Sequence, residues 1–230
     1  MKISAEFVTS AAGARDFPRD RLAEVALLGR SNVGKSSLIN ALVRQKVART
    51  SAAPGKTRLA NFYRVQRGSG PALYLVDLPG YGYARGGDAS ATEFNRLTEA
   101  YFSRGLPGIG ARGSGLGDRD SGLGAGIPSP GSRVPDPESG VRIGVLLLVD
   151  ARHPGLEPDL EAWRWLRSQP CSRGIVGTKA DKLTRAERAR HGRELESLFD
   201  VPVQLVSAQT GEGLEALWKL IATLPNQTAP

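Results

Sequence analysis

Eight residues from Gly29 to Ser36 read G-R-S-N-V-G-K-S and directly follow the short apolar run Val25 to Leu28. A glycine at each end lets such a loop turn its backbone N–H groups inward around a phosphate, and Lys35 can then reach the β and γ phosphates of a nucleotide. Because this loop needs a strand before it and a helix after it, the segment restricts the chain to an α/β fold. The alternative is an ordinary glycine turn that opens a helix.

The rest of the chain alternates apolar runs with amphipathic stretches, which predicts a mostly parallel six-stranded sheet with one antiparallel hairpin strand and helices on both faces. We expect strands at 25–28, 59–66, 72–77, 143–150, 174–177 and 203–207, and helices at 35–44, 92–104, 158–168, 185–199 and 213–224. Ligands of such sheets bind at the carboxyl ends of the strands.

One segment, residues 105–140, interrupts this alternation. It is rich in glycine and proline, contains no aromatic side chain and has only scattered aliphatic ones. Such a composition cannot bury enough surface to offset the entropy lost on ordering. We therefore expect a single domain over residues 1–230, in which 105–140 is a disordered insertion.

The composition narrows the class of protein. No apolar run approaches the ~20 residues that cross a bilayer, and the N-terminus does not read as a signal peptide, so we expect a cytoplasmic protein. The single cysteine, Cys171, cannot form an internal disulfide. A net charge of +8 and a pI near 10.0 indicate attraction to polyanions. A basic surface without a nucleic-acid partner is the alternative.

A second motif, Asp77-Leu78-Pro79-Gly80, ends an apolar strand. A carboxylate there can hold Mg²⁺ through water, and the glycine N–H can sense a γ phosphate, whereas a turn cap is the alternative role for Asp77. Between this motif and the phosphate loop lies the polar stretch from Arg49 to Arg58. Its Thr57 can add a second hydroxyl to the Mg²⁺, or it is a plain loop threonine.

A third motif, Thr178-Lys179-Ala180-Asp181, follows another short strand. A carboxylate at Asp181 can accept two hydrogen bonds, from N1–H and the 2-amino group of guanine, and adenine offers no such pair of donors. The stem of Lys179 would lie along the base, and Ser207-Ala208 can offer a backbone N–H to guanine O6. The motif predicts GTP rather than ATP, with a solvated turn as the alternative.

In this order, the motifs are similar to those of translation-factor-class GTPases. More narrowly, five strings resemble the EngB (YihA/YsxC) family of bacterial GTPases over nearly the whole chain outside 105–140: R-T-S at 49–51, P-G-K-T at 54–57, D-L-P-G-Y-G-Y-A at 77–84, D-A-R-H-P at 150–154 and T-K-A-D-K-L at 178–183. The resemblance implies a protein that binds GTP and GDP with Mg²⁺, hydrolyses GTP, helps assemble the large (50S) ribosomal subunit and is needed for cell division and septation. We expect it to be a monomer. A GTP-gated binding module in septation is the alternative, and a P-loop kinase or ATPase is disfavoured by Asp181.

The motifs and the resemblance together imply a set of site residues. The expected nucleotide ligands are Gly29, Arg30, Ser31, Asn32, Val33, Gly34, Lys35, Ser36, Gly55, Lys56, Thr57, Arg58, Leu59, Asp77, Leu78, Pro79, Gly80, Thr178, Lys179, Ala180, Asp181, Val206, Ser207 and Ala208. Among these, Ser36, Thr57 and Asp77 are the expected Mg²⁺ ligands. The expected catalytic residues are Lys35, Thr57 and Gly80.

Two residues bear on the reaction rate. Tyr81 stands where Ras-type enzymes place the glutamine that orients the attacking water, which predicts slow intrinsic hydrolysis. Asn32 occupies the loop position at which an asparagine helps to bind K⁺ in related GTPases; a loop residue with unusual backbone angles is the alternative.

Tyr81, Tyr83 and the arginines of 185–190 are candidates for contact with ribosomal RNA. For these arginines, an ordinary charged helix face is the alternative.

Overall fold

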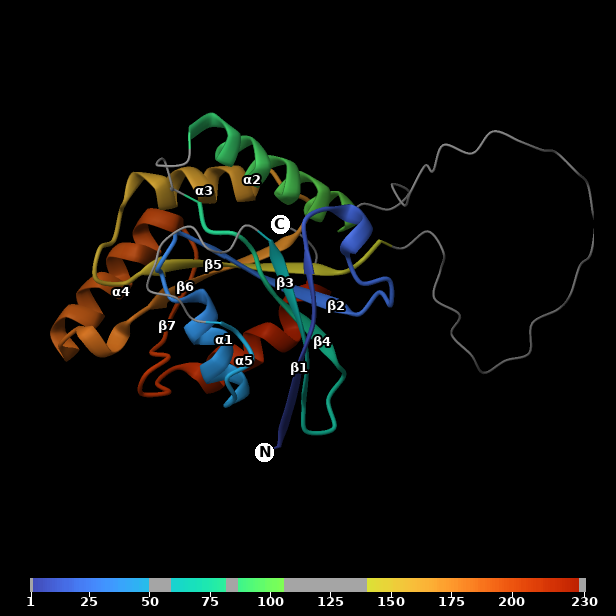
Figure 1. Ribbon diagram of the computed structural model, residues 1–230. Coiled ribbons are helices and arrows are strands. Elements are labelled where there is room, and N and C mark those ends of the chain that lie inside the picture. The colour runs from blue at the N-terminus through green and yellow to red at the C-terminus, as the bar shows by residue number, and fades with distance from the viewer. Residues whose placement is uncertain (1, 50–58, 82–86, 106–139, 228–230) are drawn as a thin grey trace, which may run out of the picture.

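A twisted seven-stranded sheet with helices on both faces forms the described part of the chain in this computed structural model (Figure 1). The structure describes residues 2–49, 59–81, 87–105 and 140–227. The strands are β1 (Ile3–Ala11), β2 (Ala23–Gly29), β3 (Ala60–Arg67), β4 (Leu73–Asp77), β5 (Ile143–Asp150), β6 (Ser172–Thr178) and β7 (Val203–Leu205). The α-helices are α1 (Lys35–Val43), α2 (Gly87–Phe102), α3 (Glu157–Arg167), α4 (Arg185–Phe199) and α5 (Leu214–Thr223).

The strand order across the sheet is β1-β3-β4-β2-β5-β6-β7. Strand β3 runs antiparallel to both of its neighbours, and every other neighbouring pair is parallel. The expected α/β class, with a mostly parallel sheet and one antiparallel strand, is therefore confirmed. All parallel strands present their carboxyl ends at the same edge of the sheet.

The expectation of six strands was wrong, because the N-terminal segment adds β1 at the edge of the sheet. Its residues pair antiparallel with β3, from Ile3 opposite Arg67 to Ala11 opposite Ala60. The pairing shifts register between Phe7 and Thr9. This bulge interrupts the alternation of apolar and polar residues that identifies a strand, so only Ile3, Ala5 and Phe7 carried the signal.

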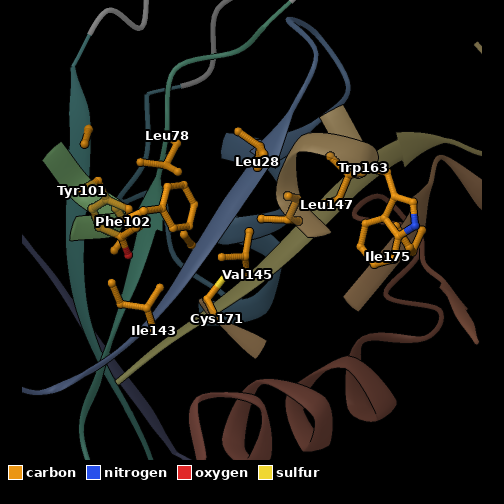
Figure 2. Close-up of a cluster of buried hydrophobic side chains, with 14 of the residues drawn as sticks. Leu28, Leu78, Tyr101, Phe102, Ile143, Val145, Leu147, Trp163, Cys171 and Ile175 are labelled. Atoms are coloured by element: carbon orange, nitrogen blue, oxygen red, sulfur yellow. The ribbon is translucent and has the colours of Figure 1, made fainter. Parts of the chain in front are cut away.

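Two hydrophobic cores lie on opposite faces of the sheet. One is covered by α2, α3 and α4 and includes Tyr101, Trp163 and Phe199, and part of it is seen in Figure 2. The other is covered by α1 and α5 and includes Leu38 and Trp218. Strand β5 is buried along its whole length and feeds both cores with alternate side chains, as a central parallel strand requires.

Several boundaries differ from the expected ones. Strand β6 is longer than 174–177 and ends at Thr178; a Cβ atom at Gly177 would lie 2.5 Å from Cδ2 of Leu205, so packing against β7 explains the glycine. Helix α2 begins at Gly87 rather than at residue 92. Within the described ranges, no helix has both the length and the apolar character needed to cross a bilayer.

The two ends of the expected insertion meet at the edge of the sheet opposite the strand carboxyl ends. The backbone N–H of Val141 donates to the carbonyl of Arg104 at 3.1 Å. The Arg104 guanidinium forms an ion pair with buried Glu24 at 3.0 Å and lies 4.7 Å from the ring centre of Phe17. Residues 106–139 themselves lie outside the described residues, but the chain leaves and re-enters the domain at one fixed point.

Replacing residues 106–139 by a short glycine-serine link is expected to leave the domain folded. The linked ends are already hydrogen-bonded, and shortening a loop of this size should change the free energy of unfolding by only about 1 kcal/mol. Thermal unfolding and calorimetric nucleotide affinity should therefore match those of the full chain. Loss of cooperative unfolding in the shortened chain would show that the segment contributes to the core.

Candidate nucleotide-binding site

The loop between β2 and α1 is curled by two residues in the left-handed region. Asn32 has φ 63° and Gly34 has φ 110°. A Cβ atom at Gly29 would lie 2.8 Å from the carbonyl oxygen of Leu148, so the close approach of β5 requires glycine there. Such a loop, ahead of a helix N-terminus, turns backbone N–H groups into a concave anion-binding surface.

The Lys35 side chain lies within this loop rather than in solvent. Its ammonium donates to the carbonyl of Gly29 at 3.1 Å and to that of Arg30 at 3.4 Å, and the residue is buried. Burial lowers the pKa of Lys35, and the nearby Asp77 carboxylate opposes that shift. The cation is thus held where an anion cradled by the loop would meet it.

Ser36 and Asp77, 41 residues apart, are in direct contact. The serine hydroxyl donates to Oδ2 of Asp77 at 2.7 Å. Oδ1 of Asp77 is buried without a hydrogen-bond partner, and burial raises the pKa of this carboxyl while Lys35 and Ser36 oppose the shift. A hydroxyl and an unsatisfied carboxylate oxygen fit a hard divalent cation that takes its remaining ligands from water and phosphate. No cluster of three or more His, Cys, Asp or Glu side chains forms a metal cage in the described ranges.

The D-x-P-G turn runs along the phosphate loop. The N–H of Leu78 donates to the carbonyl of Leu27 at 3.2 Å. A Cβ atom at Gly80 would lie 2.8 Å from the backbone nitrogen of Ser31, so only glycine allows this approach. The next residue, Tyr81, forms an isolated bridge with Arg30. The backbone of Gly80 is therefore adjacent to the loop that runs from Gly29 to Ser36.

The T-K-A-D motif is tied to the phosphate loop by side chains. The Thr178 hydroxyl donates to the carbonyl of Val33 at 2.8 Å. The Lys179 ammonium donates to the carbonyl of Asn32 and to Oδ2 of Asp150, both at 2.9 Å. Lys179 therefore joins its own T-K-A-D loop to the phosphate loop and to the end of β5, and these bonds fix the distance between the two loops.

Asp181 meets the S-A motif. The Ser207 hydroxyl donates to Oδ1 of Asp181 at 2.7 Å, and the N–H of Ala180 donates to the carbonyl of Val206 at 3.1 Å. The Ser207 bond lowers the pKa of Asp181, so the carboxylate is ionised at neutral pH. Ala208 lines a hollow of about 520 Å³ beside α1. The loops after β6 and β7 thus present one carboxylate, oriented by a hydroxyl, beside the phosphate loop.

The structure does not cover every expected ligand. Gly55, Lys56, Thr57 and Arg58 lie outside the described residues, and Leu59 is exposed just before β3. The remaining expected residues lie at the last positions of β2, β4 and β6, in the segments that follow β2, β4, β6 and β7, and at the start of α1, all at one edge of the sheet.

Two supporting residues were not recognised in the sequence. Asp150, at the end of β5, accepts bonds from Arg152 and Lys179, and these partners hold its pKa well below its usual range against the effect of burial. Asn40 of α1 exchanges two hydrogen bonds with the backbone of Ala48, both at 2.8 Å. Asp150 could have been recognised because, like Asp77, it is an acid at the end of a buried strand. The sequence around Asn40 gives no comparable signal.

Comparisons with known proteins agree with this geometry. Residues 24–104 match a family described as 50S ribosome-binding GTPase. A probable GTP-binding protein EngB of Heliobacterium modesticaldum is 36% identical over 236 residues, covering 100% of this chain and 97% of that relative. The corresponding protein of Symbiobacterium thermophilum is 39% identical, with 96% and 95% covered.

Solved structures share the fold. A crystal structure of a probable GTP-binding protein EngB superposes with a TM-score of 0.53 at 19% identity, covering 89% of this chain and 99% of that one. Era, in complex with MgGDPNP and a 16S ribosomal RNA fragment, superposes with a TM-score of 0.62 at 19% identity, covering 88% of this chain and 56% of Era. With full-length relatives well above 30% identity and a GTPase fold, the chain belongs to the EngB family of GTP-binding proteins.

Proposed function

We propose that this protein is a slow, Mg²⁺-dependent GTPase switch that acts in assembly of the large ribosomal subunit and is needed for cell division and septation. The observation that carries the guanine specificity is the Asp181 carboxylate, ionised and oriented by Ser207 beside a phosphate loop. A carboxylate of this kind accepts from N1–H and the 2-amino group of guanine. We further propose that it works as a cytoplasmic monomer.

The site residues take the following proposed roles. Backbone N–H groups of Gly29 to Ser36 cradle the phosphates, and Lys35 donates to the β and γ phosphate oxygens. Ser36 and Asp77, with Thr57, would hold the Mg²⁺, which supplies positive charge against the phosphates when bound. Gly80 presents its N–H to the γ phosphate. Base recognition falls to Thr178–Asp181 and to Val206–Ala208, and the segment 55–59 completes the phosphate site.

Slow turnover is proposed from the surroundings of Tyr81. Its hydroxyl donates to Asp159 at 2.8 Å, which leaves it engaged with α3 rather than with an attacking water. Burial raises the pKa of Tyr81 far above its usual value, so this phenol cannot serve as a base. The negative charge that develops on the phosphate oxygens in the transition state must then be stabilised by other groups.

A K⁺ ion near Asn32 is the proposed source of that charge. The structure supports a structural role for the Asn32 backbone, whose carbonyl accepts from Lys179. If K⁺ also acts there, GTP turnover in KCl should exceed turnover in NaCl at equal ionic strength by about tenfold or more. Equal rates in the two salts would remove K⁺ from the proposal.

The ribosomal role is proposed from the family description and from the net charge of +8, which suits a phosphate-rich partner. Sedimentation with purified 50S particles tests it. Co-sedimentation with a non-hydrolysable GTP analogue, but not with GDP, supports the assembly switch. Absence of analogue-dependent binding would favour a septation module that is gated by GTP without the ribosome. Lys35→Ala serves as the control that should remove the nucleotide dependence.

A further inference from the structure

The residue after the D-x-P-G turn is held by a helix on the far side of that turn. The Tyr81 hydroxyl donates to Oδ1 of Asp159 at 2.8 Å. Asp159 lies in the first turn of α3 and is only 2% exposed. An acid in a first turn interacts favourably with the helix dipole, but that interaction does not require burial. The burial of this carboxylate therefore needs another reason.

A buried carboxylate is costly unless it is hydrogen-bonded and its charge is offset. Burial raises the pKa of Asp159, while the Tyr81 hydrogen bond and the charge of Arg30 oppose the shift and Asp150 adds to it. Both of the stabilising groups come from the candidate site. Arg30 belongs to the phosphate loop, and Tyr81 follows Gly80. The free-energy cost of burying the Asp159 carboxylate is thus offset by two residues of the candidate nucleotide-binding site.

The geometry around Gly80 shows how little freedom this turn has. Gly80 packs so closely on the phosphate loop that a Cβ atom would lie 2.8 Å from the nitrogen of Ser31. Tyr81 is bridged to Arg30 through the backbone and to Asp159 through the side chain. Because consecutive Cα atoms are about 3.8 Å apart, fixing Tyr81 at two points restricts where the Gly80 N–H can lie.

We propose that Tyr81 and Asp159 are positioning residues for the triphosphate state. Their hydrogen bond holds the Gly80 N–H against the phosphate loop, where a γ phosphate oxygen accepts from it. This inference rests on the proposed role of Gly80. GDP lacks the γ phosphate, so the bond between Tyr81 and Asp159 should contribute to the binding of GTP and not to that of GDP.

Tyr81→Phe tests this proposal with the loss of one oxygen atom and no change in ring packing. Calorimetry would measure affinity for GDP and for a non-hydrolysable GTP analogue. We expect GDP affinity to stay within about twofold of the parent and analogue affinity to fall about tenfold. Asp159→Ala should give a similar selective loss, and Asp159→Asn, which keeps an acceptor oxygen, a smaller one. The double variant Tyr81→Phe/Asp159→Ala should lose no more than the larger single loss.

Tyr74→Phe is the matched control. The Tyr74 hydroxyl also donates to a carboxylate at 2.8 Å, that of Asp20, but from the start of β4, at the opposite end of that strand from Asp77. In the Tyr74→Phe variant, the ratio of analogue affinity to GDP affinity should equal that of the parent. The proposal is overturned if Tyr81→Phe leaves that ratio unchanged. This includes the case in which the affinities for both nucleotides fall equally, as a general loss of stability would cause. Failure of the parent itself to bind GDP would instead overturn the proposed function.

Discussion

Replacing Asp181 by asparagine is expected to turn a guanine nucleotide site into one that prefers xanthine nucleotides. The carboxylate accepts from two guanine donors, whereas an amide has one acceptor and one donor. The amide would face the 2-amino group of guanine with a like donor but could donate to the 2-oxo group of xanthine. GDP affinity should fall at least about 100-fold, and XDP affinity should rise above it.

The control for this substitution is Asp200→Asn. Asp200 is exposed at the end of α4 and has φ 56°, a conformation that asparagine tolerates. This change removes the same charge from the protein away from the loops of the site. Its GDP affinity should match that of the parent. If Asp181→Asn binds GDP as tightly as Asp200→Asn does, Asp181 does not read the base.

Lys35→Ala is expected to weaken GDP and GTP binding together, by about 100-fold or more. The ammonium lies inside the phosphate loop, where charge-assisted bonds to phosphate oxygens are strong. The substitution also leaves the carbonyls of Gly29 and Arg30 without this donor, so a loss of about 1–3 kcal/mol in the free energy of unfolding should accompany it. Affinity is measured by calorimetry, and stability by thermal unfolding.

Lys219→Ala separates the two effects, because Lys219 is an exposed lysine of α5. It removes the same charge outside the site and should leave nucleotide affinity within about twofold. A folded Lys35→Ala variant that retains nearly full affinity for both nucleotides would mean that the phosphates bind elsewhere.

Most of the sheet was predictable because the residue pattern of a strand reflects whether one or both of its faces are buried. Strand β5 is an unbroken apolar run, as burial on both faces requires, and its expected limits at 143 and 150 match the structure. Helix α4 also matches its expected range. It begins with a capping box in which Thr184 and Glu187 exchange hydrogen bonds, so its start is encoded locally. The expected site loops could be placed together because parallel strands end at one edge.

The contacts between distant segments were not predictable. No local pattern shows that the Lys179 side chain crosses to the carbonyl of Asn32, or that Tyr81 reaches Asp159. The stem of Lys179 is predicted to lie along the base, and the contact of its ammonium with the phosphate loop is an additional feature that the motif does not indicate. Gly177 weakens the pattern of its strand for a reason that only packing against Leu205 reveals. Each of these features depends on tertiary distance rather than on neighbouring residues.

The most direct test of the account is a pair of calorimetric titrations of the full chain, with GDP and with ADP, at the same Mg²⁺ concentration. The phosphates are identical in the two nucleotides, so any difference reports the base. With the Asp181 carboxylate held by Ser207 beside the phosphate loop, GDP should bind at least about 100-fold more tightly than ADP. Equal affinities for GDP and ADP would contradict a guanine nucleotide switch.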